Sequence, residues 1–374
     1  MVNMGNVLGL IFANMHDTTI NDLTNTRTMG SVPFGGRYRL IDFPLSNMVN
    51  SGITEVGVIT KSNYQSLLDH LDSGREWDLS RKNGGLHILP PFGHAGSGMY
   101  RGRLEALSGV LGYIQHSDAE YVVMSDCDVV ANIDLRKVVQ EHAERGADIT
   151  SVYVRGDCSS DQTANRTILH LDAEERVNDV LLRPGICGPC SISLNIFVMS
   201  RAFMVEMAKE AASRSLYSFE QDVFQRRVKE LKIYGSRFDG YCRQIDSMKN
   251  YFAGNMDMLN AEVRNALFPR NRPIYTKVRD EAPARYGIDA AAHHSVIADG
   301  CIIEGEVENS VLFRGVHVEK GARVRNSIIM QGTVVGQKSD ILYAVTDKDV
   351  TIGGYRSLAG SPVYPVFVSK RAVV

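Results

Sequence analysis

Apolar side chains recur every six residues between residues 295 and 352, and this repeat restricts the possible fold more than any other feature of the chain. The longest series consists of Leu312, Val318, Val324 and Met330, and the same spacing joins Val296 to Ile302 and Ile328 to Val334. A six-residue period predicts a left-handed parallel β-helix, in which each flat face of a coil turns one apolar side chain inward. Strands of a β-sandwich, the alternative fold, alternate with a period of two. Because a coil is buried only by its neighbours, about three coils are needed, and this stretch is long enough to supply them.

The preceding two-thirds of the chain alternates between short apolar runs and amphipathic segments. The expected strands are Val7–Ala13, Glu55–Lys61, Tyr121–Met124, Asp148–Val154 and Leu194–Met199, and the expected helices are Gly102–Gln115, Arg136–Arg145 and Ala202–Ser213. This alternation predicts an α/β domain with a mostly parallel sheet. Such sheets bind ligands beyond the carboxyl ends of their strands, so we expect the chemistry in the loops after Ala13, Lys61 and Met124.

Two breaks in the pattern separate these regions. The first is the proline-rich stretch Phe268–Pro273, and the second is Glu281–Pro283. We therefore expect an α/β domain over residues 1–268, a linker over residues 269–290 and the β-helix over residues 291–374.

The charge balance and hydropathy exclude several classes of function. Lys and Arg number 41 and Asp and Glu number 43, so the formal net charge is −2, without the basic excess typical of nucleic-acid binding. No apolar run approaches the roughly 18 residues of a membrane span. The segment Met1–Asn6 lacks the basic and then apolar order of a signal peptide. We expect a cytoplasmic protein with neither a nucleic-acid nor a membrane partner.

The cysteines do not indicate a disulfide framework, because six of them are spread over the whole chain. Cys187 and Cys190 have the spacing of a redox dithiol, but that motif works at the start of a helix, and here the expected strand Ser191–Ser200 follows. A zinc site would need a second pair of this kind. We expect Cys187 and Cys190 to be an incidental dithiol in a loop.

One segment closely resembles a family signature. Residues Val32–Asn47 read Val-Pro-Phe-Gly-Gly-Arg-Tyr-Arg-Leu-Ile-Asp-Phe-Pro-Leu-Ser-Asn, which is similar to the bacterial and plant ADP-glucose pyrophosphorylases (glucose-1-phosphate adenylyltransferases). The resemblance continues through Tyr100–Gly102, Tyr121–Val123, Asp128 and Tyr241–Leu259. It implies a Rossmann-like (GT-A-like) nucleotidyltransferase domain followed by a left-handed β-helix, which is the order that the two patterns predict.

The catalytic loop of that family is altered here. In the family the first strand leads into Gly-Gly-x-Gly-Thr-Arg-Leu, where glycine N–H groups approach a triphosphate and the Arg neutralises the departing pyrophosphate. In this chain Asn14, Met15 and Asp17 replace the glycines, Thr19 replaces the Arg, and Met29 stands in the position of a catalytic Lys. Two like charges about 4 Å apart repel by about 4 kcal/mol at an effective dielectric near 20, so Asp17 alone is expected to weaken nucleotide binding.

The metal ligands of the family are only half present. The resemblance implies that two Asp residues hold Mg²⁺, and Asp128 matches the first of them, but Gln244 stands in place of the second. Asp246 shares the strand face of Gln244 and is an alternative ligand. Asp126 and Asp128 are alternatively ordinary caps at the end of a strand. We expect no cofactor for this chain alone, with Mg²⁺ used by a catalytic partner.

Several arginines are candidates for binding an anion. They are Arg27, Arg37, Arg39, Arg101 and Arg183. Arg183 stands in the position of the family's sugar-phosphate-binding Lys, although Leu182 replaces the Glu before it. The effector site of the family is basic and lies between its domains, so the resemblance implies an anionic effector, and a solvated arginine cluster is the alternative. Arg103 occupies a Thr position of the family's Trp-Tyr-Arg-Gly-Thr-Ala-Asp segment, which here is Met99–Glu105.

Nucleotidyl transfer depends almost wholly on positioning and on stabilisation of charge, so losing the loop, the Arg, the Lys and one metal ligand together leaves little to carry the reaction. This combination resembles the GlgD-type subunit of Gram-positive glycogen synthesis. The resemblance implies a regulatory, catalytically impaired subunit that modulates a catalytic GlgC-type partner within a heterotetramer. Two alternatives stay open: an active sugar-nucleotide pyrophosphorylase with an atypical phosphate loop, and a stand-alone sensor of a sugar phosphate or nucleotide.

Overall fold

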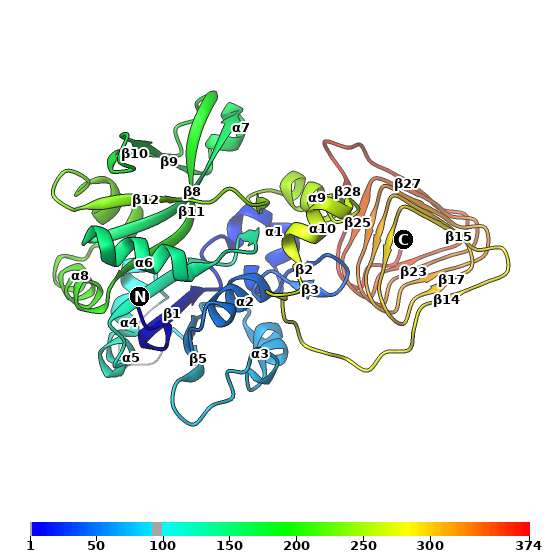
Figure 1. Cartoon of the computed structure of the whole chain (residues 1–374). Coiled ribbons are helices and arrows are strands. Elements are labelled where there is room, and N and C mark those ends of the chain that lie inside the picture. The colour runs from blue at the N-terminus through cyan, green and yellow to red at the C-terminus, as the bar shows by residue number, and fades with distance from the viewer. Residues whose placement is uncertain (1, 92–98) are drawn as a thin grey trace.

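The computed structural model describes residues 2–91 and 99–374 and shows an α/β domain followed by a parallel β-helix (Figure 1). The predicted fold class is therefore confirmed. In the described part of the chain, no helix combines the length and the apolar character needed to cross a membrane.

A nine-stranded sheet forms the centre of the N-terminal domain. Four parallel strands lie in the order β6, β1, β4 and β5, and the long strand β11 runs antiparallel to β6. These strands are β1 (Val7–Phe12), β4 (Glu55–Ile59), β5 (Gly85–Leu89), β6 (Tyr121–Asp126) and β11 (Gly188–Ser200). The outer strands are β8 (Ile149–Cys158), β9 (Thr167–Leu171), β10 (Val177–Leu182) and β12 (Ile233–Arg237). The sheet is mixed rather than mostly parallel, because β9 and β10 join as a hairpin and β11 runs antiparallel to β6, β8 and β9.

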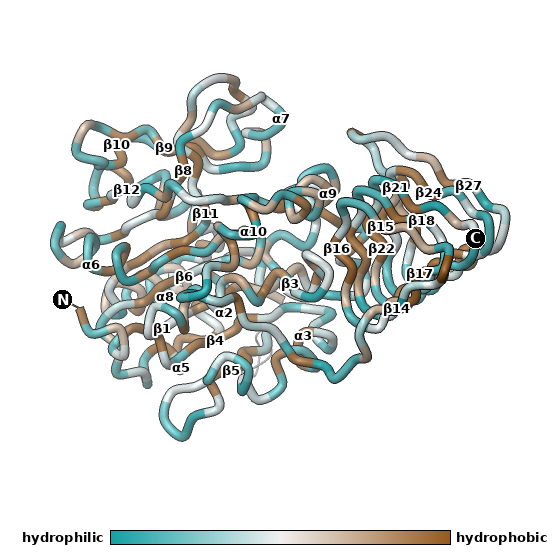
Figure 2. Tube along the Cα trace, turned by 45° about the vertical axis from the view of Figure 1, so that its right-hand side comes forward, coloured by the Kyte–Doolittle hydropathy of each residue, from teal (hydrophilic) through white to brown (hydrophobic). Residues whose placement is uncertain are grey.

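Helices cover both faces of this sheet (Figure 1), and its central strands are rich in hydrophobic residues (Figure 2). The apolar side chains of these strands pack against the helices. One face packs against α4 (Arg103–Gly109), α5 (Leu111–His116) and α8 (Arg201–Arg214). The other face packs against α2 (Asp42–Asn50), α3 (Gln65–Leu71) and α6 (Leu135–Arg145). The single helix expected over Gly102–Gln115 is thus two helices, since the backbone leaves the helical conformation at Val110.

Shorter elements complete the domain. They are α1 (Asn21–Thr24), α7 (Ser160–Thr163), α9 (Met248–Asp257), α10 (Ala261–Leu267), the hairpin of β2 (Pro33–Phe34) and β3 (Tyr38–Arg39), and the pair of β7 (Val129–Ala131) and β13 (Cys242–Gln244). Phe12 at the end of β1 pairs in register with Asp126 at the end of β6. The loops that follow these two strands therefore meet at one edge of the sheet, as the sequence predicts.

The β-helix consists of three five-stranded parallel sheets that form the sides of a triangle (Figure 1). The first sheet contains β14 (Arg285–Tyr286), β17 (Ile302–Ile303), β20 (His317–Val318), β23 (Val334–Val335) and β26 (Thr351–Ile352). The second contains β15 (Ala291–His293), β18 (Glu306–Glu308), β21 (Arg323–Arg325), β24 (Asp340–Leu342) and β27 (Ser357–Ala359). The third contains β16 (Val296–Ile297), β19 (Val311–Leu312), β22 (Ile328–Ile329), β25 (Ala344–Thr346) and β28 (Val366–Val368).

The coils are shorter than three strict six-residue repeats. Val318 pairs with Val335 and Val335 with Ile352, so these coils are offset by 17 residues, whereas Ile303 pairs with Val318 at an offset of 15. The missing residue is at the corner between the second and third sheets, where Asn309, Asn326 and Tyr343 each turn the chain with a positive φ. A single left-handed residue makes this corner tighter than the six-residue pattern alone indicates.

The β-helix also begins earlier than expected. Strand β14, Arg285–Tyr286, pairs with Ile302–Ile303 of β17. These backbone hydrogen bonds place it in the first coil, although it lies inside the range 269–290 expected to be linker. The boundary at 291 is thus displaced, because the break at Glu281–Pro283 rather than residue 290 ends the irregular segment.

A shared hydrophobic core joins the two domains. Phe34 and Phe43 from the Val32–Asn47 segment pack with Phe313 and Met330 of the β-helix in one buried cluster. Gly36 has a φ of +85° and lies against the β-helix, where an added Cβ atom would be 3.4 Å from a side-chain carbon of Val296. The signature segment therefore positions the β-helix against the sheet domain.

Candidate functional site

The loop after β1 closes around its own carboxylate. The Oδ1 atom of Asp17 accepts a hydrogen bond from the backbone N–H of Met29 at 2.7 Å, and its Oδ2 atom accepts one from the Asn14 side chain at 2.6 Å. The side-chain Oδ1 atom of Asn14 in turn accepts a hydrogen bond from the backbone N–H of Lys61 at 2.9 Å. The donors at this strand end are therefore bound within the chain, so a phosphate would have to displace Asp17 to reach them.

The substituted loop positions each have a place in this arrangement. Thr19 donates its hydroxyl to the carbonyl of His16 at 2.8 Å, and Met29 is buried in the core shared by the two domains. Burial raises the pKa of Asp17 to about 6, although the hydrogen bonds from Asn14 and Met29 oppose that rise. Asp17 is consequently ionised at neutral pH and places a negative charge at the mouth of the sheet.

A cluster of buried polar groups lies beside this loop at the end of β6. The imidazole Nε2 atom of His16 is 2.6 Å from Asp126 Oδ2 and 3.7 Å from Asp128 Oδ2. Asp128 also accepts hydrogen bonds from the amides of Gln244 at 2.8 Å and Asn195 at 3.3 Å. The structure thus brings together Asp128 and Gln244, as the sequence predicts, and adds His16 and Asn195.

The electrostatics of the two carboxyl groups differ. Burial raises the pKa of Asp128, and the neighbouring Asp126 adds to that effect. Burial acts in the same direction on Asp126, but the cations of Arg103 and His16 outweigh it and hold the pKa of Asp126 below its usual value. For His16, burial opposes protonation, but Asp128 and Asp126 together raise its pKa. The charged forms of His16 and Asp126 are therefore favoured, whereas burial disfavours the charged form of Asp128.

Arg103 is the principal residue that the sequence reasoning did not place in the site. Its guanidinium is buried and forms ion pairs with Asp126 and with Glu220. Glu220 lies in a π-helix, Phe219–Gln225, about a hundred positions along the chain, so no local pattern links it to Arg103. The one available sign in the sequence is that an Arg stands where the family segment has a Thr.

The residues do not fit the Mg²⁺ ion that the resemblance implies. Mg²⁺ prefers carboxylate oxygens and waters, whereas here an amide N–H of Gln244 points at Asp128 and a guanidinium occupies Asp126. Asp246, the alternative ligand, is instead paired with Arg166, whose Nε atom is 2.8 Å from Asp246 Oδ2. Asp246 therefore does not replace the missing second carboxylate ligand of Mg²⁺.

A cleft of about 370 Å³ opens beside the cluster. Its lining includes His16, Arg101, Arg166 and Arg183, which give it a cationic wall. Arg183 is exposed and unpaired with any carboxylate of the described chain, whereas Arg101 is paired with Glu105 at 2.8 Å. The cleft has the charge that a phosphate-bearing ligand needs.

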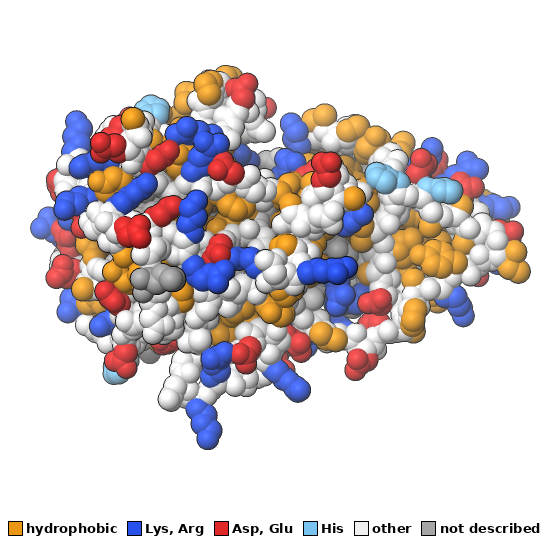
Figure 3. Space-filling view, in the orientation of Figure 1, with side chains coloured by type: hydrophobic (Ala, Val, Ile, Leu, Met, Phe, Trp, Pro, Cys, Tyr) orange, Lys and Arg blue, Asp and Glu red, His pale blue; other side chains and the backbone are white. Residues whose placement is uncertain are grey.

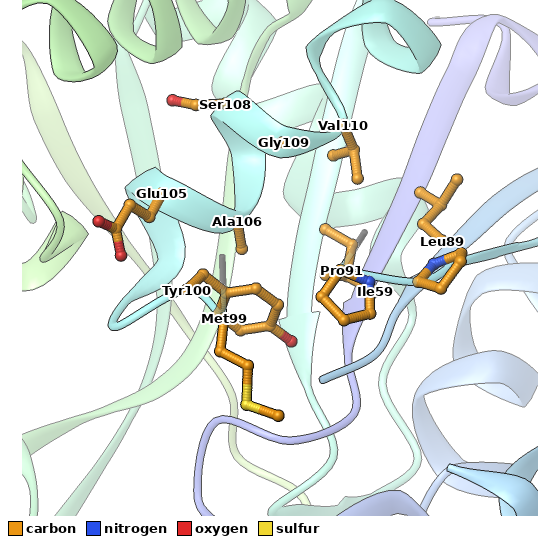
Figure 4. Close-up of a pocket in the computed structure, with 11 residues that line it drawn as sticks. Ile59, Leu89, Pro91, Met99, Tyr100, Glu105, Ala106, Ser108, Gly109 and Val110 are labelled. Atoms are coloured by element: carbon orange, nitrogen blue, oxygen red, sulfur yellow. The ribbon is translucent and has the colours of Figure 1, made fainter. Parts of the chain in front are cut away.

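A second pocket, of about 260 Å³, lies on the other side of Tyr100 between the end of β5 and α4 (Figure 4). Its labelled lining is mostly apolar, with Ile59, Leu89, Pro91 and Val110 facing the Tyr100 ring, and the carboxylate of Glu105 lies away from it (Figure 4). Residues 92–98 lie outside the described chain, and no site is assigned to this pocket.

A third group of charges lies between the two domains. Arg27 is buried, and its Nη2 atom contacts both carboxylate oxygens of Asp347 of the β-helix, at 2.8 and 3.0 Å. The other cations that influence one another here are Arg37, Arg39, Arg279, Arg314, Lys348 and Lys370. Burial, reinforced by the surrounding cations, lowers the pKa of Arg39 to about 10 and that of Lys348 to about 7. Figure 3 shows basic, acidic and hydrophobic side chains interspersed over the face of the molecule in view.

The predicted arginines thus divide between two places. Arg27, Arg37 and Arg39 belong to the group between the domains, and Arg101 and Arg183 line the cleft.

The cysteine pair is not a loop dithiol. Cys190 lies within β11 and is buried in a small apolar cluster with Cys158 and Ile168, whereas Cys187 precedes the strand and is exposed. Cys190 therefore shares its apolar cluster with Cys158, and Cys187 is not part of that cluster.

Comparison with known proteins agrees with this architecture. The chain matches the Nucleotidyl transferase family over residues 9–245 and the GlmU-like, C-terminal hexapeptide family over residues 280–358. The fold and the site therefore define a protein with a nucleotidyltransferase domain and a hexapeptide β-helix.

Three relatives narrow this class. The glycogen biosynthesis protein GlgD of Bacillus subtilis (strain 168) is 35% identical over 368 residues, which cover 98% of this chain and 96% of that protein. The glucose-1-phosphate adenylyltransferases of Pseudothermotoga lettingae and Thermotoga neapolitana are 33% and 35% identical, each over 86% of this chain and 77% of the relative. The chain belongs to the glucose-1-phosphate adenylyltransferase family, as the resemblance predicted.

Proposed function

We propose that this chain is a regulatory, catalytically impaired subunit of a glucose-1-phosphate adenylyltransferase in bacterial glycogen biosynthesis, and that it modulates a catalytic partner of the same family in a hetero-oligomer. The observation that carries the proposal is the closed loop after β1. Asp17 accepts hydrogen bonds from the backbone N–H of Met29 and the side-chain amide of Asn14. These donors therefore already bind a carboxylate of the chain where a phosphate of ATP would otherwise bind.

Three further features support impairment. Gln244 donates an N–H to Asp128 where a second carboxylate is needed, Met29 is buried in the core, and Arg103 is tied to Asp126. A subunit of this kind acts by shifting the conformational equilibrium of its partner. Such coupling is typically about 1–3 kcal/mol, which corresponds to a change of about 5–150-fold in the affinity of the partner for substrate or effector.

The test of this proposal is kinetics with and without the partner. The catalytic homologue is assayed for ADP-glucose formation alone and with increasing amounts of this chain, and size-exclusion chromatography follows the assembly. We expect a mixed oligomer and a saturable change in affinity or maximal rate. If no mixed oligomer forms and the kinetics of the homologue stay the same, the regulatory proposal is wrong, and ligand binding by the isolated chain would then favour a stand-alone sensor.

We also propose that the group of cations between the domains binds an anionic effector. Arg39, Arg314 and Lys348 are partly buried, and the Nη1 atom of Arg27 is buried without a hydrogen-bond partner among the described residues. Buried like charges repel one another, so an anion that contacts them relieves a strain that the protein carries without it.

Phosphate and pyrophosphate titrations, read by calorimetry, test this site. Arg314→Gln is expected to weaken binding about tenfold or more, because a charge-assisted hydrogen bond contributes about 1.5–3 kcal/mol. The matched control is Arg323→Gln, since Arg323 is an exposed arginine of the same β-helix that pairs with Glu306. If both variants and the wild type bind phosphate and pyrophosphate with equal affinity, the group of cations between the domains is not the effector site.

A further inference from the structure

The pocket at the ends of β1 and β6 carries cations of its own. Arg103 is 3% exposed, and its guanidinium contacts the carboxylates of Asp126 and Glu220. Its Nε atom is 3.3 Å from Asp126 Oδ1, so the contact with Asp126 uses both carboxylate oxygens. The side chain is therefore held in place from two sides rather than resting on the surface.

His16 completes the set of donors around Asp126. Its Nε2 atom is 2.6 Å from the same Oδ2 atom that Arg103 contacts. Asp128 receives the amide groups of Gln244 and Asn195. Across the described residues, three carboxylates of this pocket thus face one guanidinium, one imidazole and two amides.

Two oxygen atoms of the pocket have no such partner. Asp128 Oδ1 and Gln244 Oε1 are buried and accept no hydrogen bond from any described residue. A carboxylate oxygen and an amide oxygen are ligands that hard divalent cations accept. What opposes such an ion is the positive charge that Arg103 already places among these carboxylates.

We propose that Arg103, supported by His16, is a tethered cation that takes the place of a divalent metal ion in the pocket of Asp126 and Asp128. The guanidinium satisfies the carboxylate that an ion would need. Because it is part of the chain, it cannot be diluted away. The pocket consequently excludes divalent cations, whether or not the chain has a catalytic partner.

Binding of Mn²⁺, read by electron paramagnetic resonance on the full chain, tests this inference. The wild type is expected to bind no Mn²⁺ in this pocket. Arg103→Gln, which removes the charge but keeps a polar side chain, is expected to gain one Mn²⁺ site that the wild type lacks. Arg103→Lys keeps the cation and should behave as the wild type. Arg101→Gln, in the same segment but exposed and paired with Glu105, is the matched control.

The site is assigned by Asp128→Asn in the Arg103→Gln background, which should abolish the gained binding. If Arg103→Gln does not fold, the double variant Arg103→Gln with Glu220→Gln restores the balance of buried charge and takes its place. A folded variant without Arg103 that fails to gain Mn²⁺ overturns the inference. So does a wild-type chain whose bound Mn²⁺ is lost on Asp128→Asn.

Discussion

Asp17 determines the character of the loop after β1. In a glycine-rich loop the backbone N–H groups at such a strand end are free for a phosphate. Here the Asp17 carboxylate accepts from Met29 and Asn14, so the loop binds an anion that belongs to the chain. A single acidic side chain at this position both repels a phosphate and occupies its donors.

The raised pKa of Asp17 predicts a pH-dependent stability. Because its pKa is about 6 in the folded chain, above its usual 3.8, this group stabilises the fold below about pH 4, and that contribution is lost as the pH rises through 6. Asp17→Asn removes the dependence. Its stability relative to the wild type should rise by up to about 3 kcal/mol between pH 4 and pH 7.5, at about 1.4 kcal/mol per pKa unit.

Urea denaturation at the two pH values measures this difference, and the lost hydrogen bond to Asn14 adds an offset that does not depend on pH. Asp22→Asn, an exposed carboxylate in the next helix, is the control. A constant difference between Asp17→Asn and the wild type across this range would show that Asp17 is not buried in a charged state.

The sequence shows which residues of the family motifs are replaced, but it does not show which side chains the replacements contact in the folded chain. Asn14, Asp17 and Gln244 are visible because a familiar motif lacks its usual residues. Arg103 and His16 are not visible in this way, since Asp126 and Glu220 are their partners only after β6 and the π-helix have folded together. Comparison with a motif shows which residues differ from the family. Ion pairs between distant segments form only in the folded chain, so a motif does not show them.

At the scale of elements, the β-helix was the most predictable part of the molecule. One apolar side chain per face is a strong and local signal, and the strands β19 to β24 lie where that signal places them. The shortened corner escaped prediction, because Asn326 looks like any polar turn residue until its φ of +48° is known. The mixed sheet escaped for a similar reason: strand order is set by pairing, not by the pattern within one strand.

The corner predicts a specific pattern of tolerance. Asn326→Val should destabilise the chain by about 1–2 kcal/mol, because a left-handed conformation is unfavourable for residues other than Gly, Asn and Asp. Asn326→Gly should change the free energy of unfolding much less. Chemical denaturation of the two variants decides the matter, and an equal loss in both would mean that the Asn326 side chain, not its backbone, stabilises the corner.

At the scale of the whole molecule, the two domains share one core and one buried ion pair. Arg27 and Asp347 are 320 positions apart in the sequence and join the α/β domain to the β-helix. Removing one partner of a buried pair leaves the other uncompensated. The junction between the domains is therefore an energetic link as well as a proposed binding site.

Asp347→Asn should destabilise the chain by about 3–5 kcal/mol, the usual result of breaking a buried ion pair from one side. Added phosphate should recover part of this loss if an anion binds among the cations that remain. The double variant Arg27→Met with Asp347→Asn should lose less than the sum of the single variants. Strict additivity in a denaturation cycle would contradict the coupling between the domains.

The low pKa of Lys348 predicts how effector binding depends on pH. Burial, together with Arg39, Arg27 and Lys370, lowers the pKa of Lys348 to about 7, while Asp347 opposes the shift. An anion that requires the charged amine must therefore bring a proton with it above pH 7. Pyrophosphate affinity should fall about tenfold or more between pH 6 and pH 8.5, by up to about tenfold per pH unit. Lys348→Arg should flatten this profile, and an unchanged slope in that variant would exclude Lys348 from the site.

Catalytic impairment is tested most directly by the rate at which the purified chain alone forms ADP-glucose from ATP and glucose 1-phosphate with Mg²⁺. The preparation must be shown by mass spectrometry to be free of the catalytic homologue, which serves as the positive control. We predict no turnover above background, because Asp17 closes the phosphate loop and Arg103 occupies the metal pocket. A rate comparable with that of the catalytic homologue would contradict both assignments.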